Sequence, residues 1–125
     1  MAWESLGMIQ HYGLTPSINA LADTNLLPAI KADEKEINIL MSEIGDIRHI
    51  LKTMSDLLPL DKKKDKPINI YFHERNLENL ARAILLLTVM CETALTQRER
   101  MELFLDLYGN SMIRARSNAY LQSIV

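Results

Sequence analysis

The sequence has a single cysteine, four glycines, four prolines and few aromatic residues, which make up 6% of its 125 residues. One cysteine excludes a disulfide within the chain and is typical of a reducing compartment. The low glycine and proline content excludes collagen-like and low-complexity chains. No apolar stretch approaches the roughly 20 residues that cross a bilayer, and the N-terminus lacks the basic-then-apolar order of a signal peptide. We therefore expect a cytoplasmic protein with no membrane partner.

Neither sign of charge dominates the chain. Sixteen acidic and fourteen basic residues give a formal net charge of −2 and a pI of about 5.9. The chain thus lacks the broad basic surface by which proteins bind nucleic acid, and no nucleic-acid partner is expected. His11, His49, His73 and Cys91 share no metal-ligand spacing, so no metal site is predicted. The hydrophobic fraction of 48% is that of an ordinary globular domain.

The clearest pattern in the chain is a strand, a helix and a second strand. Residues 37–41 and 68–72 are short, β-branched and mostly apolar, which is typical of buried strands. Between them, helical spacing from Asp46 until Pro59 predicts an amphipathic helix with the inward residues Ile47, Ile50, Leu51, Met54, Leu57 and Leu58. Two strands joined by a helix form a parallel βαβ unit. We predict an α/β fold, with a Rossmann-like βαβ unit followed by helices.

The first 36 residues are the least patterned and are interpreted as an N-terminal extension, with residues 37–125 forming the domain proper. Thr15-Pro16 predicts the start of a short helix in the extension, which carries inward Ile18, Leu21 and Ala22. The charged residues 60–67 are expected to form a surface loop. Because two strands cannot form a stable open sheet alone, the sheet is interpreted as the incomplete N-terminal part of a larger one, with further strands beyond Val125.

Three helices are expected after the second strand. The first, over about 76–93, is apolar on more than one face, with Cys91 as a buried, inert thiol. The second begins at the capping box Thr96–Glu99 and ends with Gly109 as a left-handed residue. Its predicted inward residues are Met101, Phe104, Leu105, Leu107 and Tyr108. The last helix is expected from Asn110 or Ser111, and local ion pairs with neighbouring acids are expected for Arg98, Arg100, Arg114 and Arg116.

The candidate site lies where the two strands end, because ligands of parallel sheets bind at that edge. Glu74 follows the second strand, where Rossmann folds hold ribose hydroxyls, but Gly45 stands alone in place of a glycine-rich turn. Two hypotheses stay open: a scaffold without chemistry, or an S-adenosylmethionine site around Ser42, Gly45 and Glu74, since class I methyltransferases tolerate a looser glycine turn. Asp46 is expected to cap the first helix, and Arg48 to tie that helix to Glu74.

Four blocks of the sequence occur in the same order in a known family. They are residues 12–16 (Tyr-Gly-Leu-Thr-Pro), 37–54, 69–85 and 97–110. Together they resemble the N-terminal domain of the axonemal dynein assembly factor 3 family, a domain of unknown function also found in some fungal zinc-finger proteins. Ser42-Glu43 departs from the family, where a glycine is common at this turn. The residues that match the family's structural motif are Gly45, Asp46, Arg48, His49, Glu74, Gly109 and Asn110.

The resemblance implies a cytoplasmic, chaperone-like scaffold for the preassembly of axonemal dynein arms in motile cilium biogenesis. It implies a methyltransferase-like fold without enzymatic activity, catalytic residues or cofactor; a fragment of a methyltransferase that uses S-adenosylmethionine is the alternative. The implied partners are axonemal dynein heavy chains and other assembly factors or co-chaperones. Family members are several hundred residues long, so the chain corresponds to about their N-terminal quarter.

Overall fold

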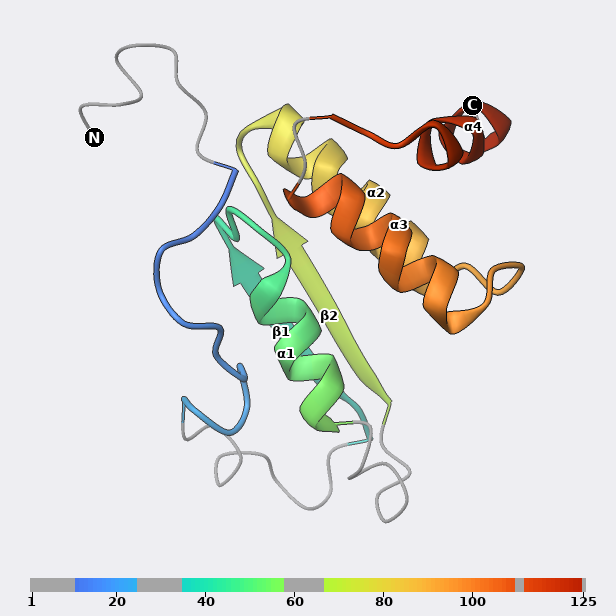
Figure 1. Ribbon diagram of the computed structural model, residues 1–125. Helices are drawn as coiled ribbons and strands as arrows, with labels where there is room; N and C mark the ends of the chain where they lie inside the picture. Colours follow the sequence, from blue (N-terminus) through green and yellow to red (C-terminus); the bar gives the residue numbers. More distant parts are fainter. Residues whose placement is uncertain (1–10, 25–34, 58–66, 110–111, 125) are drawn as a thin grey trace, which may run out of the picture. The chain divides into compact units, whose positions relative to one another are not determined.

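A computed structural model of the chain describes residues 11–24, 35–57, 67–109 and 112–124 (Figure 1). Within these residues the fold is mixed α/β. Its elements are, in chain order, β1 (Ile37–Ser42), α1 (Arg48–Leu57), β2 (Ile68–His73), α2 (Leu77–Cys91), α3 (Gln97–Gly109) and α4 (Ala115–Ile124). The chain divides into two compact units, residues 1–80 and 81–125, and each is described by itself. No helix in the described ranges is long and apolar enough to cross a bilayer.

The first unit contains the parallel sheet that the strand–helix–strand pattern predicts. β1 and β2 pair in parallel, in a register that runs from Ile37 opposite Ile68 to Ser42 opposite His73. Side chains alternate between the two faces, and the β-branched residues of both strands favour this extended backbone. Leu40 and Tyr71 lie opposite each other on the exposed face. The membership of these strands in a larger, Rossmann-like sheet stays a prediction, as does a domain boundary after residue 36.

The core of the first unit joins α1 to the sheet. Ile47 and Ile50 are 1% and 3% exposed, and Ile39 of β1 is also buried; burying each of these side chains contributes about 2 kcal/mol. The predicted inward position of Met54 is wrong, because its side chain is 42% exposed. Its neighbour Thr53 is fully buried instead. Leu58 lies outside the described residues.

In the second unit, α2 and α3 form an antiparallel pair (Figure 1). The guanidinium of Arg82 donates to the carbonyl oxygens of Leu107 at 3.2 Å and Tyr108 at 2.5 Å. At the other end of the pair, Arg100 donates to the carbonyl oxygen of Met90 at 3.2 Å. These bonds satisfy carbonyl groups near the ends of both helices, where no helical partner is available.

The start of α3 agrees with the predicted capping box. The backbone N–H of Thr96 donates to the Glu99 carboxylate at 2.9 Å, and the N–H of Glu99 donates to the Thr96 hydroxyl at 3.3 Å. α3 ends at Gly109 as predicted, but the left-handed conformation predicted for Gly109 is wrong, because its φ is not positive. Asn110 lies outside the described residues.

The predicted inward face of α3 is also wrong in part. Met101 and Leu105 are 55% and 61% exposed, whereas Leu103 and Asp106 are buried. The face of α3 that contains Asp106 is buried, because the Asp106 carboxylate accepts from Arg114 at 2.6 Å and from Ser117 at 2.5 Å. The local apolar pattern of α3 does not show these partners.

Other predicted apolar contacts of the second unit are corrected in the same way. Cys91 is exposed, so the predicted buried thiol is wrong, and Ile84 of α2 is 51% exposed. The final helix begins at Ala115, later than predicted. Met112 therefore precedes the helix and is 85% exposed.

Polar contacts attach α4 within the second unit. Besides the bonds to Asp106, Arg116 pairs with Glu99, and the Tyr120 hydroxyl donates to the Glu92 carboxylate at 2.7 Å. The predicted ion pairs are confirmed for Arg98, Arg114 and Arg116, whereas Arg100 donates to the Met90 carbonyl oxygen. Hydrogen bonds from the Ala94 N–H and from the Tyr120 hydroxyl hold the pKa of Glu92 below its usual value. The hydrogen bond to Glu92 also raises the pKa of the Tyr120 hydroxyl.

Candidate functional site at the strand ends

The ends of β1 and β2 lie at one edge of the sheet, as the parallel arrangement predicts. Ser42 and His73 are register partners there, and the N–H of Glu43 donates to the carbonyl oxygen of His73 at 2.8 Å. Ser42 is exposed. Residues 43–47 form the turn that leads from β1 into α1, and Glu74 follows β2 directly.

Glu74 connects this turn to the start of α2. One carboxylate oxygen accepts the Gly45 N–H at 2.9 Å, and the other accepts the Asn76 N–H at 3.1 Å. Glu74 is 8% exposed. Gly45 has a φ of +62°, a left-handed conformation that glycine adopts without strain. Two of the three predicted cofactor residues, Gly45 and Glu74, are therefore in contact, but they bond to each other.

Asp46 caps α1 as predicted and has a second partner that was not predicted. One carboxylate oxygen accepts the Arg48 N–H at 3.0 Å, and the other accepts the N–H of Gly13 at 2.6 Å. The Asp46 side chain is 2% exposed. The predicted tie between Arg48 and Glu74 is wrong: the Arg48 guanidinium lies 3.4 Å from Asp46 and donates to the Thr15 hydroxyl at 2.9 Å.

Residues 11–24, called here the N-terminal strap, follow α1 through a series of such bonds (Figure 1). The His49 ring accepts the Ile18 N–H at 3.1 Å, and the Thr53 hydroxyl accepts the Ala20 N–H at 2.9 Å. One turn farther, the Asp56 carboxylate accepts from the side chain of Asn19 at 3.1 Å. A stripe of polar side chains on α1 thus binds the strap backbone and holds it in place.

The strap contains no α-helix in its described residues, so the predicted short helix is wrong. Its backbone makes a single turn over residues 20–24, where the Asn19 side chain accepts the N–H groups of Leu21 and Ala22. Leu21 is buried as predicted, but Ile18 is 43% exposed. A sequence signal for the strap is the helical spacing of Asp46, which precedes α1, and of His49, Thr53 and Asp56 on α1.

Gly13 lies close to the side chain of Arg48, the first residue of α1. A Cβ atom at this position would overlap the guanidinium of Arg48. The strap is also joined to the first turn of α2, because the His11 ring lies 2.8 Å from the side-chain oxygen of Asn79. Asn79 is 4% exposed. Both contacts fix the strap by polar atoms and close approach rather than by apolar packing.

Glu43 has an uncommon backbone conformation. Its φ of +55° lies in the left-handed region that disfavours side chains. Its exposed carboxylate lies 3.5 Å from Arg75 and 3.7 Å from His73. A glycine would adopt this conformation without cost.

The arrangement at the strand ends joins elements together and shows no assembled catalytic group. No cluster of His, Cys, Asp or Glu that would hold a metal occurs among the described residues. The three carboxylates near the turn each have protein partners: Glu43 the side chains of His73 and Arg75, Asp46 and Glu74 backbone N–H groups.

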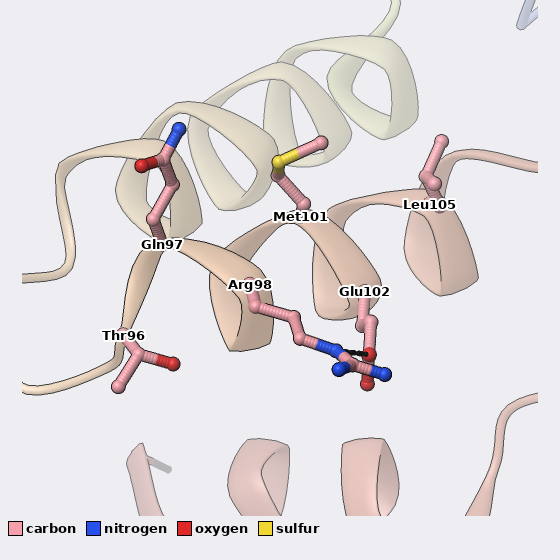
Figure 2. Close-up of a pocket in the computed structure, with 6 residues that line it drawn as sticks. All are labelled: Thr96, Gln97, Arg98, Met101, Glu102 and Leu105. Atoms are coloured by element: carbon pink, nitrogen blue, oxygen red, sulfur yellow. Dashed lines mark hydrogen bonds and ion pairs between the residues drawn. The ribbon is translucent and has the colours of Figure 1, made fainter.

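A shallow hollow lies elsewhere, on α3 (Figure 2). Gln97, Met101 and Leu105 point to one side of the helix, and the Arg98–Glu102 pair, at 2.8 Å, points to the other. Its lining combines the apolar Met101 and Leu105 with the polar Thr96 and Gln97 and the exposed ion pair.

Comparison with known proteins matches residues 11–113 to the family described as Domain of unknown function (DUF4470). Proteins named Dynein axonemal assembly factor 3 are similar over most of the chain. The one from Xenopus tropicalis is 35% identical over 118 residues, covering 88% of this chain and 26% of the relative. The one from Danio rerio is 30% identical over 115 residues, covering 90% and 23%, and the one from Homo sapiens 27% over 124 residues, covering 94% and 22%. The chain thus spans about a quarter of these relatives. No solved structure matches.

Proposed function

The chain belongs to the DUF4470 family, and we propose that it acts in the preassembly of axonemal dynein arms. The observation that supports this proposal is its 35% identity, over 88% of its length, to a protein named Dynein axonemal assembly factor 3. The similarity includes both compact units, because the family match runs from residue 11 to residue 113.

The proposed role is that of a cytoplasmic, chaperone-like scaffold rather than an enzyme. A scaffold needs defined surfaces, which the two units supply, and needs no reactive group. The bonding of Asp46 and Glu74 supports this part of the proposal, because both buried carboxylates accept from backbone N–H groups. The proposed partners are axonemal dynein heavy chains and other assembly factors or co-chaperones.

The experiment that tests this function is affinity capture of the full-length protein from the cytoplasm of ciliated cells. We expect dynein heavy chains and co-chaperones among the captured proteins identified by mass spectrometry. Their absence, with the bait expressed and folded, would overturn the proposal.

A pair of variants of the full-length protein tests whether this segment takes part. Asp46→Ala removes the carboxylate that joins the strap to α1, whereas Glu78→Ala removes an exposed carboxylate in the first turn of α2. We expect capture of dynein chains to fall with Asp46→Ala and to be unchanged with Glu78→Ala. Equal capture by both variants would mean that the segment's structure does not contribute.

A further inference from the structure

Four backbone N–H groups at the turn after β1 and the start of α1 have acceptors inside the protein. Ligand phosphates and hydroxyls at this edge of parallel sheets are held by free N–H groups of that turn. Here the N–H of Gly45 donates to Glu74, and the N–H of Asp46 donates to the Ile44 carbonyl at 2.6 Å. The N–H groups of Glu43 and Arg48 are bonded as well, to the His73 carbonyl and the Asp46 carboxylate.

Glu74, the acid at the end of β2, also has its hydrogen-bond partners inside the protein. In nucleotide-binding sheets an acid at this position accepts from ribose hydroxyls, which requires carboxylate oxygens that face the ligand. Both oxygens of Glu74 are bonded to backbone N–H groups, one on each side of the edge, and the residue is 8% exposed. Each oxygen keeps a second lone pair, but a residue that is only 8% exposed leaves little room for a ligand hydroxyl to approach it.

We propose that Glu74 is a built-in substitute for a ligand: its carboxylate locks the turn after β1 to the start of α2 and closes this edge to adenosyl and nucleotide cofactors. Glu74 is then a positioning residue for two elements rather than a binding residue. The inference rests on the hydrogen bonds of the first unit and is independent of the proposed role in dynein assembly. It counts against S-adenosylmethionine at Ser42, Gly45 and Glu74.

The lock is tested by hydrogen exchange on the full-length protein, followed by mass spectrometry of peptides that contain residues 43–48. Glu74→Gln keeps the size of the side chain but supplies one acceptor oxygen instead of two. Exchange in this peptide should rise by about tenfold or more, since a hydrogen bond to a charged acceptor is lost. Glu78→Gln removes the same charge from an exposed position of α2 and should leave exchange unchanged. Equal exchange in both variants and the wild type would overturn the lock.

The closure is tested by calorimetric titration of the wild-type full-length protein with S-adenosylhomocysteine and, separately, with ADP. We expect no saturable heat at millimolar ligand. Saturable binding that Glu74→Gln abolishes would overturn the proposal, because Glu74 would then face the ligand. If Glu74→Gln fails to fold while Glu78→Gln folds, the lock is supported. The closure is then tested by hydrogen exchange of the wild-type protein with each ligand. Unchanged exchange at residues 43–48 supports closure, and slower exchange there overturns it.

Discussion

Removing the Asp46 carboxylate should destabilise the first unit far more than loss of a helix cap alone. The cap bond to the Arg48 N–H is worth about 1 kcal/mol. The second oxygen accepts the Gly13 N–H at 2.6 Å, and a hydrogen bond to a charged acceptor contributes about 1.5–3 kcal/mol. Because one carboxylate makes both bonds at 2% exposure, Asp46→Ala should lower the free energy of unfolding by about 2–4 kcal/mol.

The measurement is urea unfolding followed by circular dichroism, with hydrogen exchange to assign the loss to the first unit. Asp46→Asn should be intermediate, because an amide keeps one acceptor for the Arg48 N–H but presents a donor in place of the other oxygen. Glu78→Ala, exposed and equal in charge change, is the control and should change stability by less than about 0.5 kcal/mol.

The reasoning would be refuted by an Asp46→Ala variant that matches the Glu78→Ala control. It would also be refuted if exchange at Gly13 were unchanged, because the strap would then not depend on the carboxylate. If Asp46→Ala lowers the free energy of unfolding by only about 1 kcal/mol and speeds exchange at Arg48 alone, the helix cap accounts for the whole effect. The bond to the strap then contributes nothing to stability.

Three further results are expected. Gly13→Ala should destabilise the chain by about 1 kcal/mol, measured by thermal melting, because its Cβ would displace the Arg48 guanidinium from the Thr15 hydroxyl; an unchanged melting temperature would contradict the close approach. Glu43→Gly should be neutral or stabilising by up to about 1 kcal/mol, since relief of the left-handed φ offsets the greater freedom of the unfolded chain, and a clear loss in urea unfolding would count against strain there. Hydrogen bonds lower the pKa values of Glu92, Glu99 and Glu102 below the usual 4.5, so the stability that these bonds contribute is present above that pH and is lost as pH falls through the folded-state pKa values. Hydrogen exchange in α3 and α4 should therefore rise in that acidic range. Exchange rates that do not depend on pH, after correction for intrinsic exchange, would contradict these pKa shifts.

The elements that the sequence predicts well are those whose signals are local. The two strands show β-branched apolar runs, and the residues that begin helices carry caps: Asp46 for α1 and the Thr96–Glu99 pair for α3. Each signal involves residues within a few positions of one another, so neither needs tertiary structure. Parallel pairing of β1 and β2 then follows from the connecting helix.

The predictions that failed depend on partners distant in the sequence. The apolar pattern of α3 favours Met101 and Leu105 on the inward face, yet Asp106 is buried in their place. A buried carboxylate is tolerated only with partners, and these are Arg114 and Ser117, outside the helix. A rule that places every acidic residue on the surface cannot predict the burial of Asp106, because the rule takes no account of its partners.

The strap shows why the candidate site was harder to predict than the fold. Residues 11–24 have neither helical nor alternating apolar spacing, so their order cannot come from their own pattern. It comes from α1, where His49 and Thr53 accept N–H groups of the strap at successive turns. Asp46 and His49 thus accept hydrogen bonds from the backbone of the strap.

The same principle separates a structural acid from a reactive one at the strand ends. A carboxylate whose two oxygens each accept a backbone N–H is held in one orientation, which suits a lock between two segments. Glu74 and Asp46 each meet that description, and each joins a segment at least 29 residues away in the sequence. Their removal should therefore be detected first as increased exchange of Gly45 and Gly13, before any loss of partner binding. If a variant of either acid lost partner binding while the N–H groups of Gly45 and Gly13 stayed protected from exchange, that acid would contact the partner directly.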